Sequence, residues 1–215
     1  MKGNSERVPN KNLKNFSGKP LYHKTLDVLL KSKYIDSVII NTDCSKIESD
    51  LNSNYFNKTI IHKRPESIIG NYVSMNKIIE YDLSKLNSDI YIQTHSTNPL
   101  LLTKTIDSAL EKFLTFKKKY DSIFSVSRTQ KRFYDQNSLP LNHDPNMLVT
   151  QHLKPIFEEN SCFYIFSKKS FLSSNSRIGS RPFMYEIDKV QSIDIDENKD
   201  FIIAEAVFNL LRNEK

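Results

Sequence analysis

The first twenty residues, MKGNSERVPNKNLKNFSGKP (Met1–Pro20), hold most of the net positive charge of this 215-residue chain. Six basic side chains and one acidic side chain give the first 24 residues a charge of +5, and the whole chain carries +6. A charge surplus confined to one short segment predicts a local anion-binding site and not a generally basic surface. On charge alone, a solvated basic tail remains the alternative interpretation.

The residue types of this segment suit a loop that binds phosphate. The turn formers Gly3–Ser5 allow successive backbone N–H groups to form a concave nest for phosphate oxygens. Lys2, Arg7 and Lys11 can neutralise the charge of a polyphosphate. Apolar residues spaced three and four apart from Leu21 onward predict a helix, and the positive end of its dipole would face the same loop.

The order of these residues resembles the nucleotide-binding signature of the acylneuraminate (CMP-sialic acid synthetase-like) cytidylyltransferases, S-x-R-x-P-x-K-N followed by G-K-P-L. In this chain the signature reads Ser5, Arg7, Pro9, Lys11, Asn12 and then Gly18–Leu21. In that family a β-strand directly precedes the loop, whereas only Met1 precedes Lys2 here. We therefore expect either a true start upstream of Met1 or a truncated variant whose sheet lacks its first strand.

Strand-like and helix-like segments alternate along most of the chain, which predicts βαβ units. The expected helices span residues 21–33, 45–53, 73–86, 103–118 and 197–212, and the expected strands 37–43, 59–62, 89–94, 121–127 and 161–167. We expect one α/β domain over residues 1–215, with three layers and a mostly parallel, Rossmann-like sheet of the nucleotidyltransferase kind. Residues 183–187 and 190–194 are expected to pair as strands.

Ligands of such sheets bind beyond the carboxyl ends of the strands. That rule selects three candidate site loops, Asn41–Asp43, His95–Pro99 and Ser127–Arg128. The alternation stops between Arg128 and Thr150, and a loop of this length is usually functional or part of an interface. The resemblance implies a dimerisation or lid subregion within residues 128–186.

Two aspartates near the C-terminus form the second strong signal. Asp194 and Asp196 are two positions apart, so an extended chain presents both carboxylates on one face. Two like charges held together are costly unless a cation neutralises them, and Mg²⁺ bound by carboxylates and substrate phosphates fits that need. A solvated strand end that leads into a helix is the alternative. The run D-I-D followed by D-F resembles the metal-binding aspartates of the same family.

Two further segments resemble substrate-binding loops of the family. Gln93–Leu100 resembles the sugar-contacting loop L-Q-P-T-S-P-L, with His95 at the position of the family's glutamine, so the sugar stays open. His62–Glu66 resembles the R-P loop near the base and ribose. A polar loop that caps the next helix and a surface turn are the respective alternatives. The substrate-binding candidates are Ser5, Asn12, Arg64, Ser74, His95, Asn98, Gln151 and Asn160.

The resemblance implies a specific reaction, in which the anomeric hydroxyl of an acidic eight- or nine-carbon ketosugar attacks the α-phosphate of CTP. The products would be a CMP-sugar and pyrophosphate. Lys2, Arg7 and Lys11 would act as catalytic cations, and Asp194 and Asp196 would hold Mg²⁺. The expected partners are CTP, the ketosugar and a possible second copy of the chain, with no nucleic acid and no membrane.

Three alternatives stay open on the sequence. The chain could be a nucleotidyltransferase for another sugar or sugar phosphate, a non-catalytic protein that binds anions or nucleic acid, or an inactive relative. The pair Asp194 and Asp196 argues against nucleic acid because it would repel phosphates in the absence of a metal. Cys44 and Cys162 are expected to be free thiols of a cytoplasmic protein, since no signal peptide and no apolar run of about 18 residues is visible.

Overall fold

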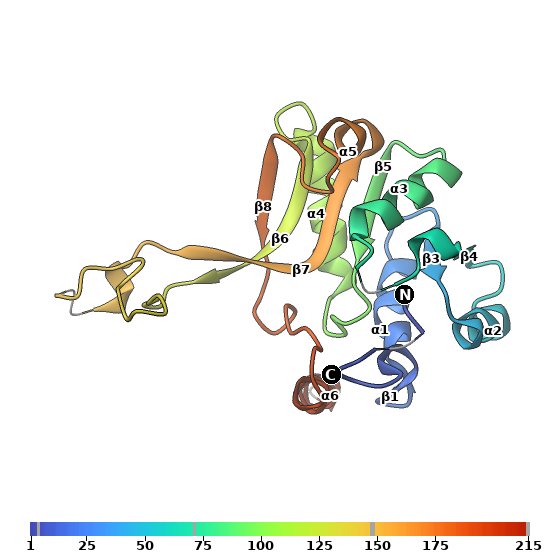
Figure 1. Cartoon of the computed structure of the whole chain (residues 1–215), viewed down its shortest axis with the longest axis horizontal. Coiled ribbons are helices and arrows are strands. Elements are labelled where there is room, and N and C mark those ends of the chain that lie inside the picture. The colour runs from blue at the N-terminus through green and yellow to red at the C-terminus, as the bar shows by residue number, and fades with distance from the viewer. Residues whose placement is uncertain (4, 71, 147–148, 214–215) are drawn as a thin grey trace.

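The computed structural model describes residues 1–3, 5–70, 72–146 and 149–213 and shows an α/β fold with helices on both sides of a central sheet (Figure 1). The helices follow the predicted ranges closely. They are α1 (Leu21–Leu30), α2 (Ser45–Asn54), α3 (Met75–Lys85), α4 (Thr103–Phe116), α5 (Lys168–Ser174) and α6 (Asn198–Asn213), with 3₁₀ turns at Lys11–Leu13, Glu66–Ile68 and Thr150–His152.

The strands form three hydrogen-bonded groups. They are the hairpin of β1 (Asn15–Phe16) and β2 (Lys19–Pro20), the parallel pair of β3 (Val38–Thr42) and β4 (Thr59–Lys63), and a four-stranded sheet of β5 (Ile90–Thr94), β7 (Ile156–Ser167), β6 (Ser122–Thr129) and β8 (Pro182–Glu186) in that order. β6 and β8 are parallel, and β7 is antiparallel to both of its neighbours. The fold class is therefore the predicted one, with β7 as the antiparallel exception.

Helices cover both faces of the four-stranded sheet, which explains why the centre of β7 is an unbroken apolar run. Phe163 and Ile165 pack in a buried cluster with α4, whereas Tyr164 and Phe166 pack with α3 and α5. Alternate residues of a strand point to opposite faces, so consecutive buried residues place β7 in the middle layer. The three predicted layers are confirmed.

One predicted strand pair is wrong. β8 pairs with β6 and not with residues 190–194, of which 190–192 form a turn and 193–194 have no regular secondary structure. The carboxylate of Asp188 accepts the backbone N–H of Val190 at 2.8 Å, and the carbonyl of Asp188 accepts the N–H of Ser192 at 3.2 Å. An aspartate that binds the backbone two residues ahead favours a turn over an extended strand.

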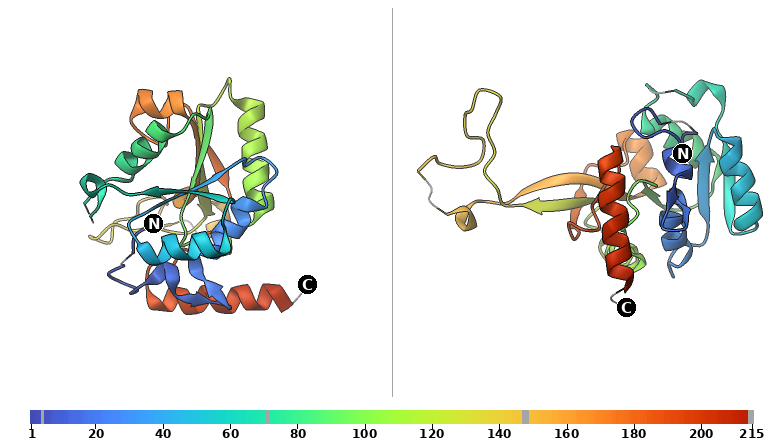
Figure 2. Two further views of the ribbon diagram at one scale, coloured as in Figure 1. Left: turned by 90° about the vertical axis from the view of Figure 1, so that its right-hand side faces the viewer. Right: turned by 90° about the horizontal axis from the view of Figure 1, so that it is seen from below.

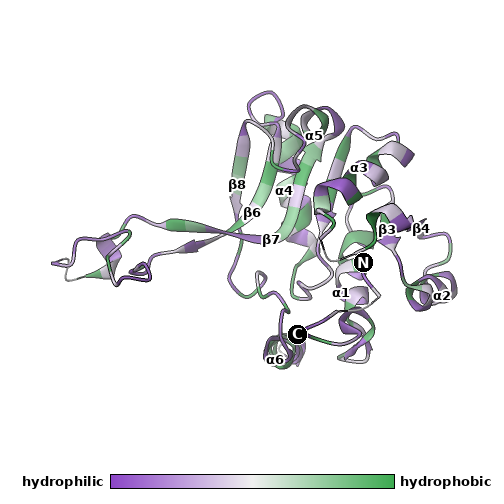
Figure 3. Ribbon diagram, in the orientation of Figure 1, coloured by the Kyte–Doolittle hydropathy of each residue, from purple (hydrophilic) through white to green (hydrophobic). Residues whose placement is uncertain are grey.

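β6 and β7 continue beyond the body as a two-stranded ribbon, and the residues between them extend it into an arm (Figures 1 and 2). The pairing shifts register between Phe124 and Val126, and the ribbon then runs to the pair of Thr129 and Ile156. The arm exposes large apolar side chains, among them Leu139 and Leu141 at 61% and 65%. The irregular stretch predicted from Arg128 onward is thus a projecting arm, which the hydropathy colouring shows as a mixture of polar and apolar residues (Figure 3).

α6 joins the two ends of the chain. Phe201 of α6 packs edge-on against Phe16 of β1, with ring centroids 5.4 Å apart, in a buried cluster that also holds Leu21 and Ile195. This contact brings the segment that precedes α6 against the N-terminal loop. Figure 1 shows α6 beside β1, below the sheet. No helix among the described residues combines the length and apolar character that a membrane crossing requires.

Candidate active site

The N-terminal loop and the aspartate segment, the two strongest signals in the sequence, meet in one place. The ammonium group of Lys11 donates to the carbonyl of Ile195 at 2.5 Å, and the guanidinium of Arg7 lies 2.8 Å from a carboxylate oxygen of Asp196. Ile195 is fully buried beneath this contact. The structure therefore places Asp194 and Asp196 on either side of a fixed backbone point that touches the basic loop.

The charges at this junction favour a ligand that carries both a cation, for the aspartates, and anionic groups, for Arg7 and Lys11. Burial raises the pKa of Asp194, a hydrogen bond from Thr97 opposes that rise, and the charge of Asp196 adds to it. Burial lowers the pKa of Lys11. The side chains of Arg7 and Asp196 are 62% and 47% exposed, so their ion pair is screened by water and worth little to stability. Arg7 can therefore leave Asp196 and bind an anionic ligand with little loss in the free energy of unfolding.

The donor set fits a magnesium ion that is shared with phosphate. Within the described ranges, no three His, Cys, Asp or Glu side chains are arranged to hold a metal by themselves. Mg²⁺ in phosphoryl-transfer sites is usually held by one or two carboxylates, with substrate phosphates and water completing the octahedron. Asp194 and Asp196 could supply those carboxylates. The N–H of Ile195 donates to the carbonyl of Thr97 at 3.0 Å, which fixes the backbone between them.

Asn12 ties the loop to the segment after β5. Its side-chain amide donates to the carbonyl of Lys2 at 3.0 Å, and its side-chain oxygen accepts from the hydroxyl of Ser96 at 2.8 Å. Lys2 is exposed and Ser5 is half-buried in the same loop. Asn4, the middle residue of the predicted turn Gly3–Ser5, lies outside the described residues. Asn12 thus shapes the loop in this structure.

Residues at the carboxyl ends of β3 and β4 form the second wall of the site. The N–H of Gly3 donates to the carboxylate of Asp43 at 2.7 Å, and Arg64 lies 3.7 Å from the same carboxylate. The Arg64 side chain is 4% exposed, and its Nε donates to the side chain of Asn41 at 2.8 Å. One terminal nitrogen of Arg64 is buried without a hydrogen-bond partner among the described residues. A buried donor of this kind favours an acceptor supplied by a ligand.

His95 and Arg177 form the third wall. Arg177 donates to the side chain of Gln93 at 2.7 Å and to the hydroxyl of Tyr164 at 3.0 Å, and it lies 3.4 Å from Nε2 of His95. The guanidinium also stacks over the Tyr164 ring, 3.7 Å from its centroid. Burial and the charge of Arg177 lower the pKa of His95 to about 4. His95 is therefore neutral near pH 7, with Nε2 turned toward a cation.

The remaining predicted residues do not all lie beside the junction of the basic loop and the aspartate pair. Asn98 is buried, and its amide donates to the carbonyl of Ile193 at 3.4 Å, next to the aspartate pair. Ser74 is exposed and immediately precedes α3. Asn160 donates to the hydroxyl of Ser127 at 3.0 Å and so braces the sheet. Gln151 lies in the 3₁₀ turn Thr150–His152 of the arm, between β6 and β7, where its carbonyl accepts from Gln130 at 2.8 Å.

Sequence reasoning missed several neighbours of these residues. Gln93, Tyr164 and Glu159 hold Arg177, but nothing local in the sequence connects Arg177 with a strand end 84 residues earlier. Asp43 was not missed, because the rule on strand ends selected Asn41–Asp43 as a candidate site loop. The missed contacts are tertiary ones between segments that are far apart in the chain.

The whole chain, residues 1–215, matches the family described as Cytidylyltransferase. The chain belongs to this family. Among curated relatives, N-acylneuraminate cytidylyltransferase A of Danio rerio is 29% identical over 213 residues, which cover 95% of this chain and 48% of that protein. Pseudaminic acid cytidylyltransferase of Campylobacter jejuni subsp. jejuni is 23% identical over 97% of this chain and 94% of that protein. The chain spans about half the length of the first of these relatives.

Two solved structures share the fold at low identity. A CMP:2-keto-3-deoxy-manno-octonic acid synthetase complexed with CTP superimposes with a TM-score of 0.71 at 14% identity, and the match covers 98% of this chain and 96% of that one. 4-Diphosphocytidyl-2C-methyl-D-erythritol synthase from Anaerococcus prevotii gives a TM-score of 0.66 at 14% identity, over 97% and 93% of the two chains. The cytidylyltransferase family membership and the nucleotidyltransferase fold thus agree.

Proposed function

We propose that this chain transfers a CMP group from CTP to the anomeric hydroxyl of an acidic ketosugar of the sialic acid class. The sugar oxygen attacks the α-phosphorus and loses its proton, the bond to the β-phosphate oxygen breaks, and pyrophosphate leaves. The observation that carries the proposal is the meeting of the basic loop with the aspartate pair, at Arg7 and Asp196 and at Lys11 and Ile195. Cations and carboxylates around one position suit a metal-bound triphosphate.

Each group at the junction has a role in this reaction. Lys2, Arg7 and Lys11 would bind the phosphates and stabilise the charge that develops as pyrophosphate leaves. Ser5 and Asn12 would hold the nucleotide. The buried Arg64 has a terminal nitrogen that lies 3.7 Å from Asp43 and makes no hydrogen bond among the described residues, and it would direct this N–H toward the base or ribose. Asp194 and Asp196 would hold Mg²⁺, which neutralises phosphate charge when it is bound.

The cluster around Arg177 supports an acidic sugar. A guanidinium has five N–H donors, so Arg177 can bind Gln93 and Tyr164 and still add a carboxylate. Neutral His95 beside it can exchange hydrogen bonds with sugar hydroxyls. The names of relatives that act on N-acylneuraminate and pseudaminic acid support the same class.

A homodimer that uses the apolar side chains of the arm is also proposed, because a lone ribbon with this exposure is marginally stable in water.

The test is a direct assay of CMP-sugar and pyrophosphate formation. The chain would be incubated with Mg²⁺, each of the four nucleoside triphosphates, and a panel of acidic and neutral sugars. We expect turnover with CTP and an acidic ketosugar, and loss of turnover in K11A and D196A. The conservative variants K11R and D196N are the matched controls for folding. Full turnover by K11A, or equal use of neutral sugars, would contradict the proposal.

A further inference from the structure

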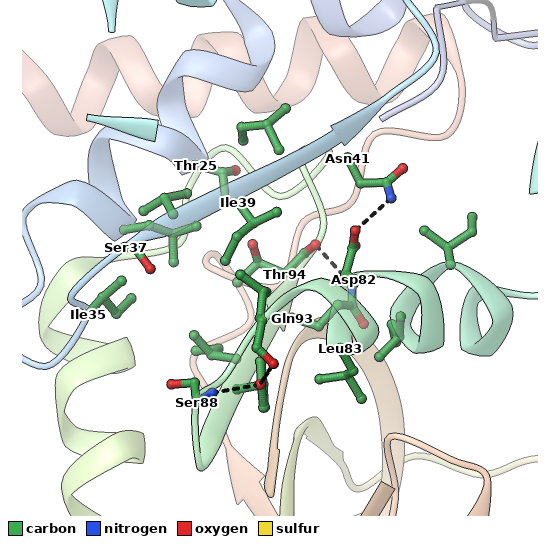
Figure 4. A pocket seen from close by; sticks show the side chains of 18 of the residues that line it. Thr25, Ile35, Ser37, Ile39, Asn41, Asp82, Leu83, Ser88, Gln93 and Thr94 are labelled. Atoms are coloured by element: carbon green, nitrogen blue, oxygen red, sulfur yellow. Dashed lines mark hydrogen bonds between the residues drawn. The ribbon is translucent and has the colours of Figure 1, made fainter. Parts of the chain in front are cut away.

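Asp82 of α3 lies at a position that no local sequence signal marks. Its carboxylate accepts the side-chain amide of Asn41 at 2.8 Å and lies 2.7 Å from Nδ1 of His62. Figure 4 shows Asn41 and Asp82 turned toward each other from β3 and α3. Both residues line the same cavity as Arg64, and the side chain of Asp82 is 22% exposed. Asp82 therefore lies one contact behind the second wall of the candidate active site.

The contact with Asp82 fixes which way the Asn41 side chain turns its two polar groups. The oxygen and the NH₂ group of an amide have nearly the same shape, so their placement depends on their partners. An ionised carboxylate only accepts hydrogen bonds, and a guanidinium only donates them. Asn41 must therefore turn its NH₂ group to Asp82 and its oxygen to Nε of Arg64, which donates at 2.8 Å. Asn41 is buried, so water has little access to either contact.

Asn41 in turn fixes the plane of the Arg64 guanidinium. Nε of Arg64 donates to the side-chain oxygen of Asn41, and Nη2 lies 3.5 Å from the backbone carbonyl of the same residue. Because a guanidinium is planar and rigid, holding this edge fixes the direction of the remaining nitrogen, Nη1. Nη1 lies 3.7 Å from the carboxylate of Asp43 and has no hydrogen-bond partner among the described residues. Asn41 thus directs a donor that is available to a ligand.

The charge of Asp82 acts on Arg64 in the same direction. The Arg64 side chain is almost fully buried, and burial disfavours a positive charge. Burial lowers the pKa of Arg64, and the negative charges of Asp43 and Asp82 raise it. Asp82 therefore stabilises the buried cation as well as the amide orientation that holds it.

We propose that Asp82 is a positioning residue of the candidate active site, which orients Arg64 through the Asn41 amide so that Nη1 reaches an oxygen atom of the bound nucleotide. The identity of that ligand rests on the proposed function. A donor that is already oriented loses little freedom when the nucleotide binds, so the arrangement favours affinity. Arg64 would face the base or ribose and not the reacting phosphorus. Loss of Asp82 should therefore raise the Kd and the KM for CTP and leave kcat nearly unchanged.

Calorimetric titration of the full chain with CTP and Mg²⁺ tests this role in D82A, N41D and the exchange variant N41D/D82N. D82A removes the acceptor, so we expect the Kd for CTP to rise about tenfold. N41D places two carboxylates in contact and should weaken binding at least as much. In N41D/D82N the amide introduced at position 82 can donate to the carboxylate introduced at position 41, which still accepts from Arg64. We expect its Kd to return to within about threefold of the parent value.

Two further measurements separate positioning from a merely structural role. E80A is the matched control, because Glu80 is an exposed carboxylate on the same helix, and we expect it to keep the parent Kd. Exchange of the Arg64 Nε proton with water, followed by NMR, shows without any nucleotide whether Asn41 holds that edge. We expect slow exchange in the parent chain, in E80A and in N41D/D82N, and exchange at least about tenfold faster in D82A.

Two results would overturn the proposal. One is parent affinity in D82A together with a protected Nε proton, and the other is a folded N41D/D82N that binds CTP as weakly as D82A. Melting curves identify a variant that fails to fold, and if D82A is one, the exchange variant still decides. A parent chain that does not bind CTP would contradict the proposed function, whereas the proton exchange would still confirm or refute the positioning of Arg64 by Asp82.

Discussion

The guanidinium of Arg7 lies 2.8 Å from the carboxylate of Asp196, 189 positions later in the chain. Both side chains are largely exposed, so we expect R7A to change the free energy of unfolding by no more than about 1 kcal/mol. On the proposed role of Arg7 as a cation that stabilises the leaving pyrophosphate, R7A should instead lower kcat about 10²-fold. Chemical denaturation and steady-state kinetics would measure the two effects. R7K is the control, and a large loss of stability in R7A with normal turnover would contradict this role.

Asp196 and Asp194 should couple metal binding to nucleotide binding. In D194N and D196N we expect the affinity for CTP to lose most of its dependence on Mg²⁺, because fewer carboxylates hold the ion. Calorimetric titrations with CTP, in the presence of Mg²⁺ and of EDTA, would measure the difference. D200N is a useful comparison, because the Asp200 carboxylate accepts the N–H groups of Asp196 and Glu197 at the start of α6. We expect D200N to lower the free energy of unfolding but to leave most of the Mg²⁺ dependence of CTP affinity in place.

His95 should make the stability of the chain depend on pH below neutrality. Its pKa is about 4 in the folded chain and 6.5 in the reference state, so the unfolded chain binds more protons between these values. The contribution of His95 to the free energy of unfolding should be at its full value above about pH 6.5. It should decrease as the pH falls toward 4, by at most about 3 kcal/mol. Denaturation curves across this range would show it. In H95Q that contribution should disappear, and an unchanged pH dependence would refute the assignment.

Gly3 should resist substitution for a steric reason. A Cβ at this position would lie 2.9 Å from Cβ and 3.2 Å from Sγ of Cys44, which is closer than side chains normally approach. We expect G3A to weaken CTP binding and to cost about 1–3 kcal/mol of stability. The double variant G3A/C44G should recover most of both, because it removes the clashing atoms. Calorimetry and thermal melting would measure the recovery.

The arm should control the oligomeric state. Leu139 and Leu141 of the arm are 61% and 65% exposed, on either side of Pro140, which pairs with Tyr134. If the arm binds a second copy, L139D/L141D should be monomeric in light scattering and should melt like the parent chain at low concentration. A substitution such as L172D, at an exposed leucine of α5 outside the arm, is the control. A parent chain that is already monomeric would contradict the homodimer.

Periodicity and strand-end polarity predicted most of this fold, but not the contacts between distant segments. The alternating pattern located α1–α4 and β3–β6 because apolar spacing reports burial directly. It could not show that β7 is antiparallel, since a strand covered on both faces has the same composition in either direction. Residues 190–192 form a turn because Asp188 binds the backbone ahead of it, a local competition that apolar spacing does not report.

The candidate site was also predicted only in part. Motif order identified Arg7, Lys11 and the aspartate pair, and the structure brings these groups together. Arg177 could not be assigned to the site from the sequence, because its position beside His95 depends on packing between α5, β7 and β5. Gln151, suggested from the sequence, lies in the arm of this chain.

The packing of Phe201 against Phe16 has a consequence for how the protein is made. The basic loop of the candidate site comes from the first twelve residues, and the segment with the aspartate pair is held against it by the packing of α6. A ribosome releases the N-terminal half first, and the aspartate pair and α6 only at the close of this stretch of chain. A nascent chain that stops before α6 therefore has a basic loop without its carboxylates. We expect no translation intermediate to bind CTP before α6 has docked.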